Sequence, residues 1–465
     1  MSTSTTAPAR PALALPSPAL RAVRSLRPVL SVLPVMAVVV LLGLPVAPGG
    51  AVTPADAASA LVVLWAVVDT VLRARRPLSR TAAVVFGLPV VGIAVAAAGA
   101  ATAADAVSGL GRYLQVFVIV PVAVMLLVRD RRQARLLLWA LIGLALWQGA
   151  IGVKQYLTGT GASYQGAFIR AVGTFGPSDV MGMATVVALG MVAATGLALA
   201  AREWRQQLVA AGCALVLLVP LALSFSRGAW IATALACGAQ LVMAGVRRAA
   251  KVLAAVVAVS VLLVGGLGVG MTALQERLTS ITQVTDAPDQ SVIDRYTMWA
   301  AAAGMWREHP VSGVGLKAFP AYRDGHASLA LSSGSDTEGP GQAYRRQPLL
   351  SPHNMYLLVL SEQGMLGLVT LAGSWLALLV CVLRRLRRRG GRARDCALPV
   401  CGLLLWQLVN FLYADIGGPS TILTAICFGL AAWWGLAHDE PPAPVTTRAP
   451  ATAPEPAPTA TSGAR

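Results

Sequence analysis

The chain has 465 residues, of which 56% are hydrophobic and only 12% are charged, and its mean hydropathy is +0.68. Soluble proteins carry about 25% charged residues, so this composition excludes an ordinary soluble domain and indicates a membrane protein. The net charge of +17 does not argue for a nucleic-acid partner. The basic residues cluster in every second connection between apolar runs, as cytoplasmic loops require.

About twelve apolar runs are long enough to cross a bilayer. The predicted spans are 29–47, 54–72, 81–103, 110–128, 134–153, 180–200, 207–223, 228–246, 252–272, 357–383, 396–414 and 418–437. The predicted fold class is therefore an all-α polytopic protein of the cytoplasmic membrane, with both termini inside. The six cysteines lie in or beside these runs without a CxxC or Cys/His cluster, which favours neither disulfides nor a metal site.

The predicted organisation has five parts. Residues 1–28 and 438–465 are Pro- and Ala-rich cytoplasmic tails without a predicted fold. Residues 29–272 hold the first nine spans, and residues 353–437 hold the last three. Residues 273–352 form a long loop on the outer face, and a loop of that length is usually functional.

The outer loop contains the stretch "SVIDRYTMWAAAAGMWREHP" (291–310). Tyr296, Trp299 and Trp306 recur in it at helical spacing, and Pro310 ends the pattern, so an amphipathic helix is predicted at the membrane surface. The following polar, Gly- and Ser-rich stretch, 324–347, is expected to be mobile.

Three outer arginines are candidates for a binding site. Arg227 lies in a very short hairpin between two apolar runs, "LSFSRGAW", where a charge at membrane depth suggests a site. The alternative is an arginine that reaches up to lipid phosphate. Arg170 could be a solvated loop charge, and Arg295 could pair with Asp294 or Asp289 on the surface helix.

His353 follows a proline and precedes an apolar run, in "SPHNMYLL". It is either a polar residue at a helix end, with Ser351 and Asn354 as caps, or a working base. The positive end of the helix dipole disfavours an imidazolium, and a neutral imidazole is the form that a general base needs.

Four stretches, taken in order, resemble the O-antigen ligase family of bacterial membrane glycosyltransferases, which includes related polymerases. They are "RAVGTFGPSDVMG" (170–182), "SFSRGAW" (224–230), "DRYTMWAAAAGMWREHPVSGVGLKAF" (294–319) and "HNMYLLVLSEQGMLGL" (353–368). The chain departs from the family after "GTFG", where Pro177, Ser178 and Asp179 stand in place of an Asn-Pro-Asn-like turn.

The resemblance implies transfer of a glycan from an undecaprenyl-pyrophosphate donor to an acceptor hydroxyl on a glycan, lipid or protein, at the outer face. It implies inversion at the anomeric carbon and no cofactor or metal. Arg170, Arg227 and Arg295 would bind the pyrophosphate through bidentate hydrogen bonds, and His353 would be the base. Asn354 and Glu362 would support the site, and the Glu362 interpretation favours helix packing over catalysis.

Two other classes of protein stay open. A transporter or flippase of polyprenyl-linked glycans also has about twelve spans and buried charges, but here the unusual residues gather at the outer face and no repeat between the halves is visible. A scaffold of envelope synthesis would leave the outer arginines unexplained. Ligase and polymerase activities are not separable by sequence, and no carboxylate of the outer loop has the apolar setting that glycosidase chemistry would use.

Overall fold

The computed structural model covers the chain and describes residues 30–45, 53–73, 78–164, 167–176, 179, 181–248, 250, 290–332, 335–339, 342–347, 349–388 and 394–437. The predicted tails 1–28 and 438–465, and the predicted span 252–272, lie outside these residues. The other predicted spans fall mostly on described residues.

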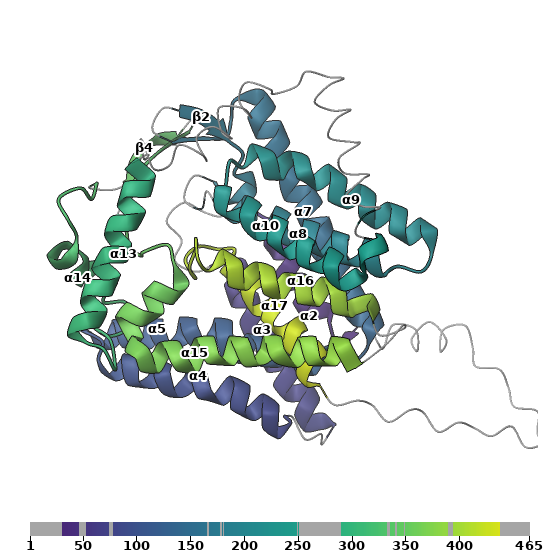
Figure 1. The fold of residues 1–465 in the computed structure, drawn as a ribbon, viewed down its shortest axis with the longest axis horizontal. Helices are drawn as coiled ribbons and strands as arrows, with labels where there is room; N and C mark the ends of the chain where they lie inside the picture. The colour runs from purple at the N-terminus through teal and green to yellow at the C-terminus, as the bar shows by residue number, and fades with distance from the viewer. Residues whose placement is uncertain are drawn as a thin grey trace, which may run out of the picture.

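The described chain is nearly all helical (Figure 1). The helices before the outer loop are α2 (Leu33–Leu41), α3 (Pro54–Leu72), α4 (Arg80–Ala98), α5 (Ala103–Leu114), a π-helical segment η1 (Gln115–Ile119), α6 (Val120–Leu127), α7 (Arg131–Thr158), a 3-10 turn η2 (Gly173–Phe175), α8 (Gly182–Ala200), α9 (Trp204–Leu223) and α10 (Arg227–Ala244). The later helices are α13 (Gln290–Glu308), α14 (Phe319–His326), α15 (Met355–Arg388), α16 (Arg394–Asn410) and α17 (Thr421–Leu436).

Seven of these helical stretches are long and apolar enough to cross a membrane, as judged by length and composition. They are Pro54–Leu72, Arg80–Ala98, Ala103–Leu127, Arg131–Thr158, Gly182–Ala200, Trp204–Leu223 and Met355–Arg388. α2, α10, α16 and α17 also overlap predicted spans but are shorter or less apolar. The protein is membrane-integral, and the count of twelve spans stays a prediction.

α8 is the most buried of the candidate spans, with 83% of its apolar window inside the protein. Its sequence explains this position, because "GMATVVALGMVAATGLALA" is built mostly from small residues that let neighbouring helices approach closely. A Cβ at Gly190 would lie 2.1 Å from the Cβ of Ala145 on α7. α7, α9, α10 and α16 pack around α8, while α15 lies beside α4 in a second group (Figure 1).

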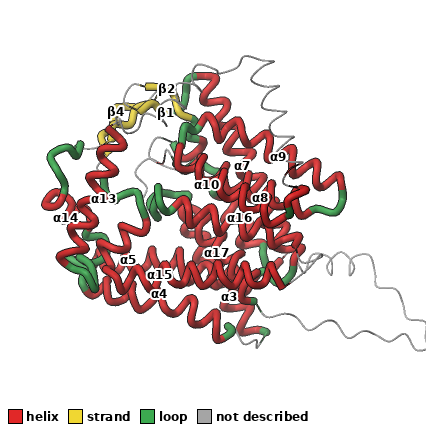
Figure 2. The backbone as a smooth tube through the Cα atoms, in the orientation of Figure 1, coloured by secondary structure: helices red, strands yellow, loops and turns green. Residues whose placement is uncertain are grey.

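A small sheet was not expected from the sequence. The hairpin of β1 (Ala162–Tyr164) and β2 (Ala167–Arg170) pairs with the hairpin of β3 (Ser335–Gly339) and β4 (Gln342–Gln347), in the order β2-β1-β3-β4. The pairing is antiparallel, with Ser163 opposite Glu338. Part of the stretch predicted to be mobile is therefore a strand pair, which lies beyond the top of α13 in the view of Figure 2.

α13 confirms the helix predicted in the outer loop but buries a different face. Met298, Ala301 and Met305 are fully buried, whereas Tyr296 is 58% exposed. The small and flexible side chains pack against α14 and α15, because they allow close helix contact. The aromatic residues are left nearer the outside, with Trp299 and Trp306 half-buried.

Candidate functional site at one end of the helices

The start of α15 is fixed to the turn that follows α16. Asn354 caps α15, since its Oδ1 accepts the backbone N–H of Leu357 at 3.1 Å. Its Nδ2 donates to the carbonyl of Leu412 at 3.2 Å, and the backbone N–H of Met355 donates to the carbonyl of Phe411 at 2.8 Å. The predicted cap at Asn354 is confirmed, and the Nδ2 of the same side chain binds the 411–415 turn.

His353 stands one residue before this cap, in an unusual backbone conformation. Its φ of 47° is left-handed, which costs a residue other than glycine about 1 kcal/mol. Trp299 on α13 donates its indole N–H to the carbonyl of the preceding Pro352 at 2.8 Å. Contacts on both sides thus hold the histidine in a conformation that an isolated chain would rarely adopt.

Asp415 is the neighbour of His353 that sequence reasoning missed. Its Oδ2 lies 4.0 Å from His353 Nδ1, and its side chain is only 9% exposed. The Ser351 hydroxyl donates to the same oxygen, and the backbone N–H of Gly417 donates to Oδ1 at 2.9 Å. The available signal was an acidic residue in the short outer turn between the last two apolar runs.

The surroundings of His353 lower its pKa below the ordinary histidine value. Burial contributes most to this shift, and the positive charge of Arg295 adds to it, while Asp415 opposes it. The ring keeps 45% of its side-chain surface accessible, yet the protein atoms around it remove enough water to disfavour the charged form. The imidazole is therefore neutral at neutral pH.

Arg227 is the first residue of α10, and Ser226 precedes it as the N-cap. The next residue, Gly228, lies so close to the 411–415 turn that a Cβ there would be 2.8 Å from the Cβ of Tyr413. The first turn of α10 therefore packs against the same turn that carries Asp415. Arg227 itself is half-buried.

Arg170 is the last residue of β2. The residue after it, Ala171, contacts the last residue of α9, just before the connection that leads to Arg227. The backbone N–H of Ala171 donates to the carbonyl of Leu223 at 3.3 Å, four residues before Arg227. The segments that carry Arg170, Arg227 and His353 are thus linked by backbone hydrogen bonds and by the close approach of Gly228 to Tyr413. Arg295 lies one helical turn before Trp299 on α13, and its charge acts on His353.

Two glutamines on α7 hold the "AVGTF" segment in place. Gln155 Oε1 accepts the backbone N–H of Gly173 at 2.8 Å, and Gln148 Oε1 accepts that of Thr174 at 2.9 Å. A Cβ at Gly173, whose φ is +62°, would lie 2.3 Å from Gln148 Oε1. These residues are seven apart on one face of α7, and sequence reasoning did not single them out.

Asp179 joins this segment to the loop before α17. Its carboxylate accepts the Ser420 hydroxyl at 3.4 Å, and burial raises the pKa of Asp179 to about 6. The departure from the family turn therefore places a carboxylate where it contacts the loop before α17.

Glu362 lies about two turns along α15, beside a kink at Gly364, whose φ is 65°. Its Oε1 accepts the backbone N–H of Phe319 at 3.3 Å, and its carbonyl accepts that of Gly315 at 3.0 Å. The N–H of Met365 donates to the carbonyl of Pro310 at 2.9 Å. Through these contacts the 310–315 loop packs into the kink of α15. The contacts of Glu362 are those expected of a residue that stabilises packing.

No group of three or more His, Cys, Asp or Glu side chains suited to a metal ion occurs within the described ranges. The polar side chains described above at this end of the helices are a histidine, two separate carboxylates and three arginines. Such a set can hold an anion and accept a proton.

The fold defines a membrane-integral, nearly all-helical protein whose candidate site residues lie at one end of its helices. Residues 212–372 match the family model described as O-Antigen ligase. The match covers about a third of the chain and includes Arg227, Arg295, His353 and Glu362, but not Arg170 or Asp415. This part of the chain is therefore similar to the O-antigen ligase family. A search of curated proteins found no match.

Proposed function

We propose that the protein transfers a glycan from a polyprenyl-pyrophosphate donor to an acceptor hydroxyl at the outer face of the cytoplasmic membrane. The observation that carries this proposal is the neutral His353 with Asp415 4.0 Å from its Nδ1, beside the helix that carries Arg295. The family match supports a glycosyltransferase of this kind.

The two ring nitrogens of His353 have different roles in this reaction. Nδ1 faces Asp415, which leaves Nε2 for the acceptor hydroxyl. As the acceptor oxygen forms its bond to the anomeric carbon, its proton passes to Nε2. Asp415 stabilises the imidazolium that results and holds the ring orientation, as carboxylates do in hydrolase triads. Base catalysis of this kind contributes about 10²–10⁴-fold.

The bond that breaks joins the anomeric carbon to a pyrophosphate oxygen, and its electron pair leaves with the pyrophosphate. This leaving group needs no proton, but its charge must be held. Guanidinium groups do so through paired, charge-assisted hydrogen bonds, and Arg170, Arg227 and Arg295 are the residues assigned to this role. Attack from the face opposite the leaving group inverts the anomeric centre.

The test is incubation of the purified protein, in lipid vesicles, with a polyprenyl-pyrophosphate oligosaccharide and a candidate acceptor. A ladder of glycan lengths would identify a polymerase, and a single transferred glycan on the acceptor would identify a ligase. Recovery of unreacted donor under all acceptor conditions would refute glycan transfer.

A further inference from the structure

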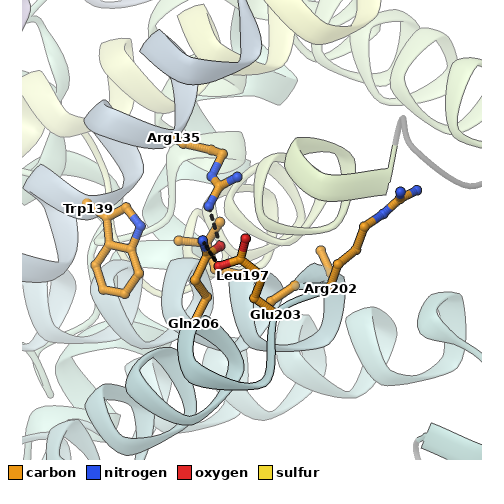
Figure 3. Close-up of a pocket in the computed structure, with 8 residues that line it drawn as sticks. Arg135, Trp139, Leu197, Arg202, Glu203 and Gln206 are labelled. Atoms are coloured by element: carbon orange, nitrogen blue, oxygen red, sulfur yellow. Dashed lines mark hydrogen bonds between the residues drawn. The ribbon is translucent and has the colours of Figure 1, made fainter.

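A second polar site lies at the far end of α7. There, α7, the end of α8 and the start of α9 enclose a cavity of about 140 Å³. Its polar lining residues are Arg135, Trp139, Arg202, Glu203 and Gln206 (Figure 3). None of them belongs to the proposed transfer site.

The cavity is about one bilayer thickness away from that site. Gln155 on α7 contacts Gly173 at the outer end, and Arg135 lies twenty residues earlier on the same helix. At 1.5 Å per residue this separation is about 30 Å, which matches the hydrocarbon core of a bilayer. Trp139 and the 65% exposed Trp204 fit the aromatic belt at a membrane surface.

Arg135 is the central group of the cavity. Within the described part of the chain it makes no ion pair, and its Nη2 donates to the neutral amide oxygen of Gln206 at 2.6 Å. Figure 3 shows its side chain pointing toward Gln206 and Glu203. A half-buried guanidinium with a neutral partner keeps hydrogen-bond donors available for an anion.

Other cations lie on segments near the cavity. Arg202 is exposed at its rim, Arg205 stacks over Trp204 at 5.6 Å, and Arg248 donates to the carbonyl of Leu199 at 2.8 Å. Glu203 opposes them, but its carboxylate is exposed and accepts the Gln206 amide at 2.9 Å. The local balance of charge is positive.

We propose that this cavity binds a phosphate group, either that of an anionic lipid headgroup or a free phosphate. Arg135 would hold the phosphate oxygens through a paired contact, and the wall formed by Trp139 and Leu197 would face the apolar part of a lipid. Basic pockets between spanning helices bind such headgroups elsewhere. Phosphate binding here does not depend on the proposed transfer reaction.

The test uses the full chain, purified in a neutral detergent and stripped of lipid. Native mass spectrometry would measure binding of phosphatidylglycerol, with phosphatidylcholine as the zwitterionic comparison. A parallel titration with inorganic phosphate would follow the thermal midpoint. The variants are Arg135→Gln, Glu203→Gln and, as the matched control on the same helix, the exposed Arg132→Gln.

We expect phosphatidylglycerol to bind about tenfold more weakly to Arg135→Gln, about the effect of one lost paired contact. Glu203→Gln should bind it more tightly, and Arg132→Gln should bind it as the wild type does. The same pattern with inorganic phosphate alone would assign the site to a soluble anion. Equal binding by Arg135→Gln and the wild type, or no binding of either probe, would overturn the proposal. Glu203→Gln keeps the test decisive if Arg135→Gln does not fold.

Discussion

At the scale of single residues, His353 is held between two opposite charges. Arg295 lowers its pKa and Asp415 raises it. A base must be neutral to accept a proton, so activity should fall as the pH drops through this pKa, below the range of an ordinary histidine. Substitution of Arg295 and substitution of Asp415 should therefore shift the pKa of His353 in opposite directions.

Arg295→Gln should move the acid limb of kcat/KM to higher pH, because it removes a cation that disfavours the imidazolium. Asp415→Asn should move the limb to lower pH, because it removes the anion that favours it. Both variants should also lose rate. Full pH profiles of kcat/KM would measure the shifts. Shifts in the same direction, or none, would show that the limb reports another group.

Substitutions of Arg227 can distinguish a paired guanidinium contact from the effect of a single positive charge. If it grips pyrophosphate through two nitrogens, Arg227→Lys should lose nearly as much activity as Arg227→Ala, since an ammonium cannot reproduce the planar fork. Turnover and donor KM of the two variants would be compared. Full turnover in the lysine variant would leave Arg227 as a point charge or a lipid anchor.

At the scale of elements, the kink in α15 depends on glycine. Gly364 has a φ of 65°, and a Cβ there would lie 2.3 Å from the carbonyl oxygen of Val311. Gly364→Ala should lower the free energy of unfolding by about 2 kcal/mol and displace the 310–315 loop. At Gly373, on the same helix, an added Cβ would meet no other atom within 4 Å.

Gly373→Ala is accordingly the matched control and should leave stability equal or higher, because alanine favours a helix over glycine. Thermal midpoints in detergent would compare the two variants. A Gly364→Ala protein as stable as the Gly373→Ala protein would show that the kink relaxes without cost.

Helices were the elements that the sequence could predict, because each apolar run must satisfy its own backbone within the membrane. α3 begins and ends at the predicted residues, Pro54 and Leu72. The sheet could not be predicted, since its two hairpins are more than 160 residues apart in sequence and lie in polar segments. The kink was hidden within an apolar run, where φ cannot be read from composition.

The site shows the same division. His353 and the arginines could be selected as candidates from the sequence, because a polar residue beside an apolar run is costly and needs a reason. Asp415 lies in a turn beside two such runs but reaches His353 only through the packing of α15 against the turn after α16. Nothing in the sequence distinguishes Gln148 and Gln155 from other polar residues, because their partners, Gly173 and Thr174, approach them only in the folded chain.

At the scale of the whole molecule, the proposed reaction requires the transfer site to face outward and the α7–α9 cavity to face inward. Leu329 is fully exposed, so Leu329→Cys should react with an impermeant reagent in intact cells. Arg388→Cys, at the end of α15, should react only after permeabilisation. The unmodified chain would measure the background from the native cysteines. The reverse pattern would invert the topology and remove the outer-face assignment.

In the proposed reaction, His353 accepts the proton of the acceptor hydroxyl during glycan transfer. The most direct measurement is the initial rate of transfer in vesicles by the wild type and by His353→Gln, with donor binding measured on the same preparations. We expect a rate at least about 10²-fold lower, with donor affinity retained and the thermal midpoint unchanged. A His353→Gln protein with near-normal turnover would contradict the claim, and the arginines would then stand alone as a site that binds lipid pyrophosphate without acting on it.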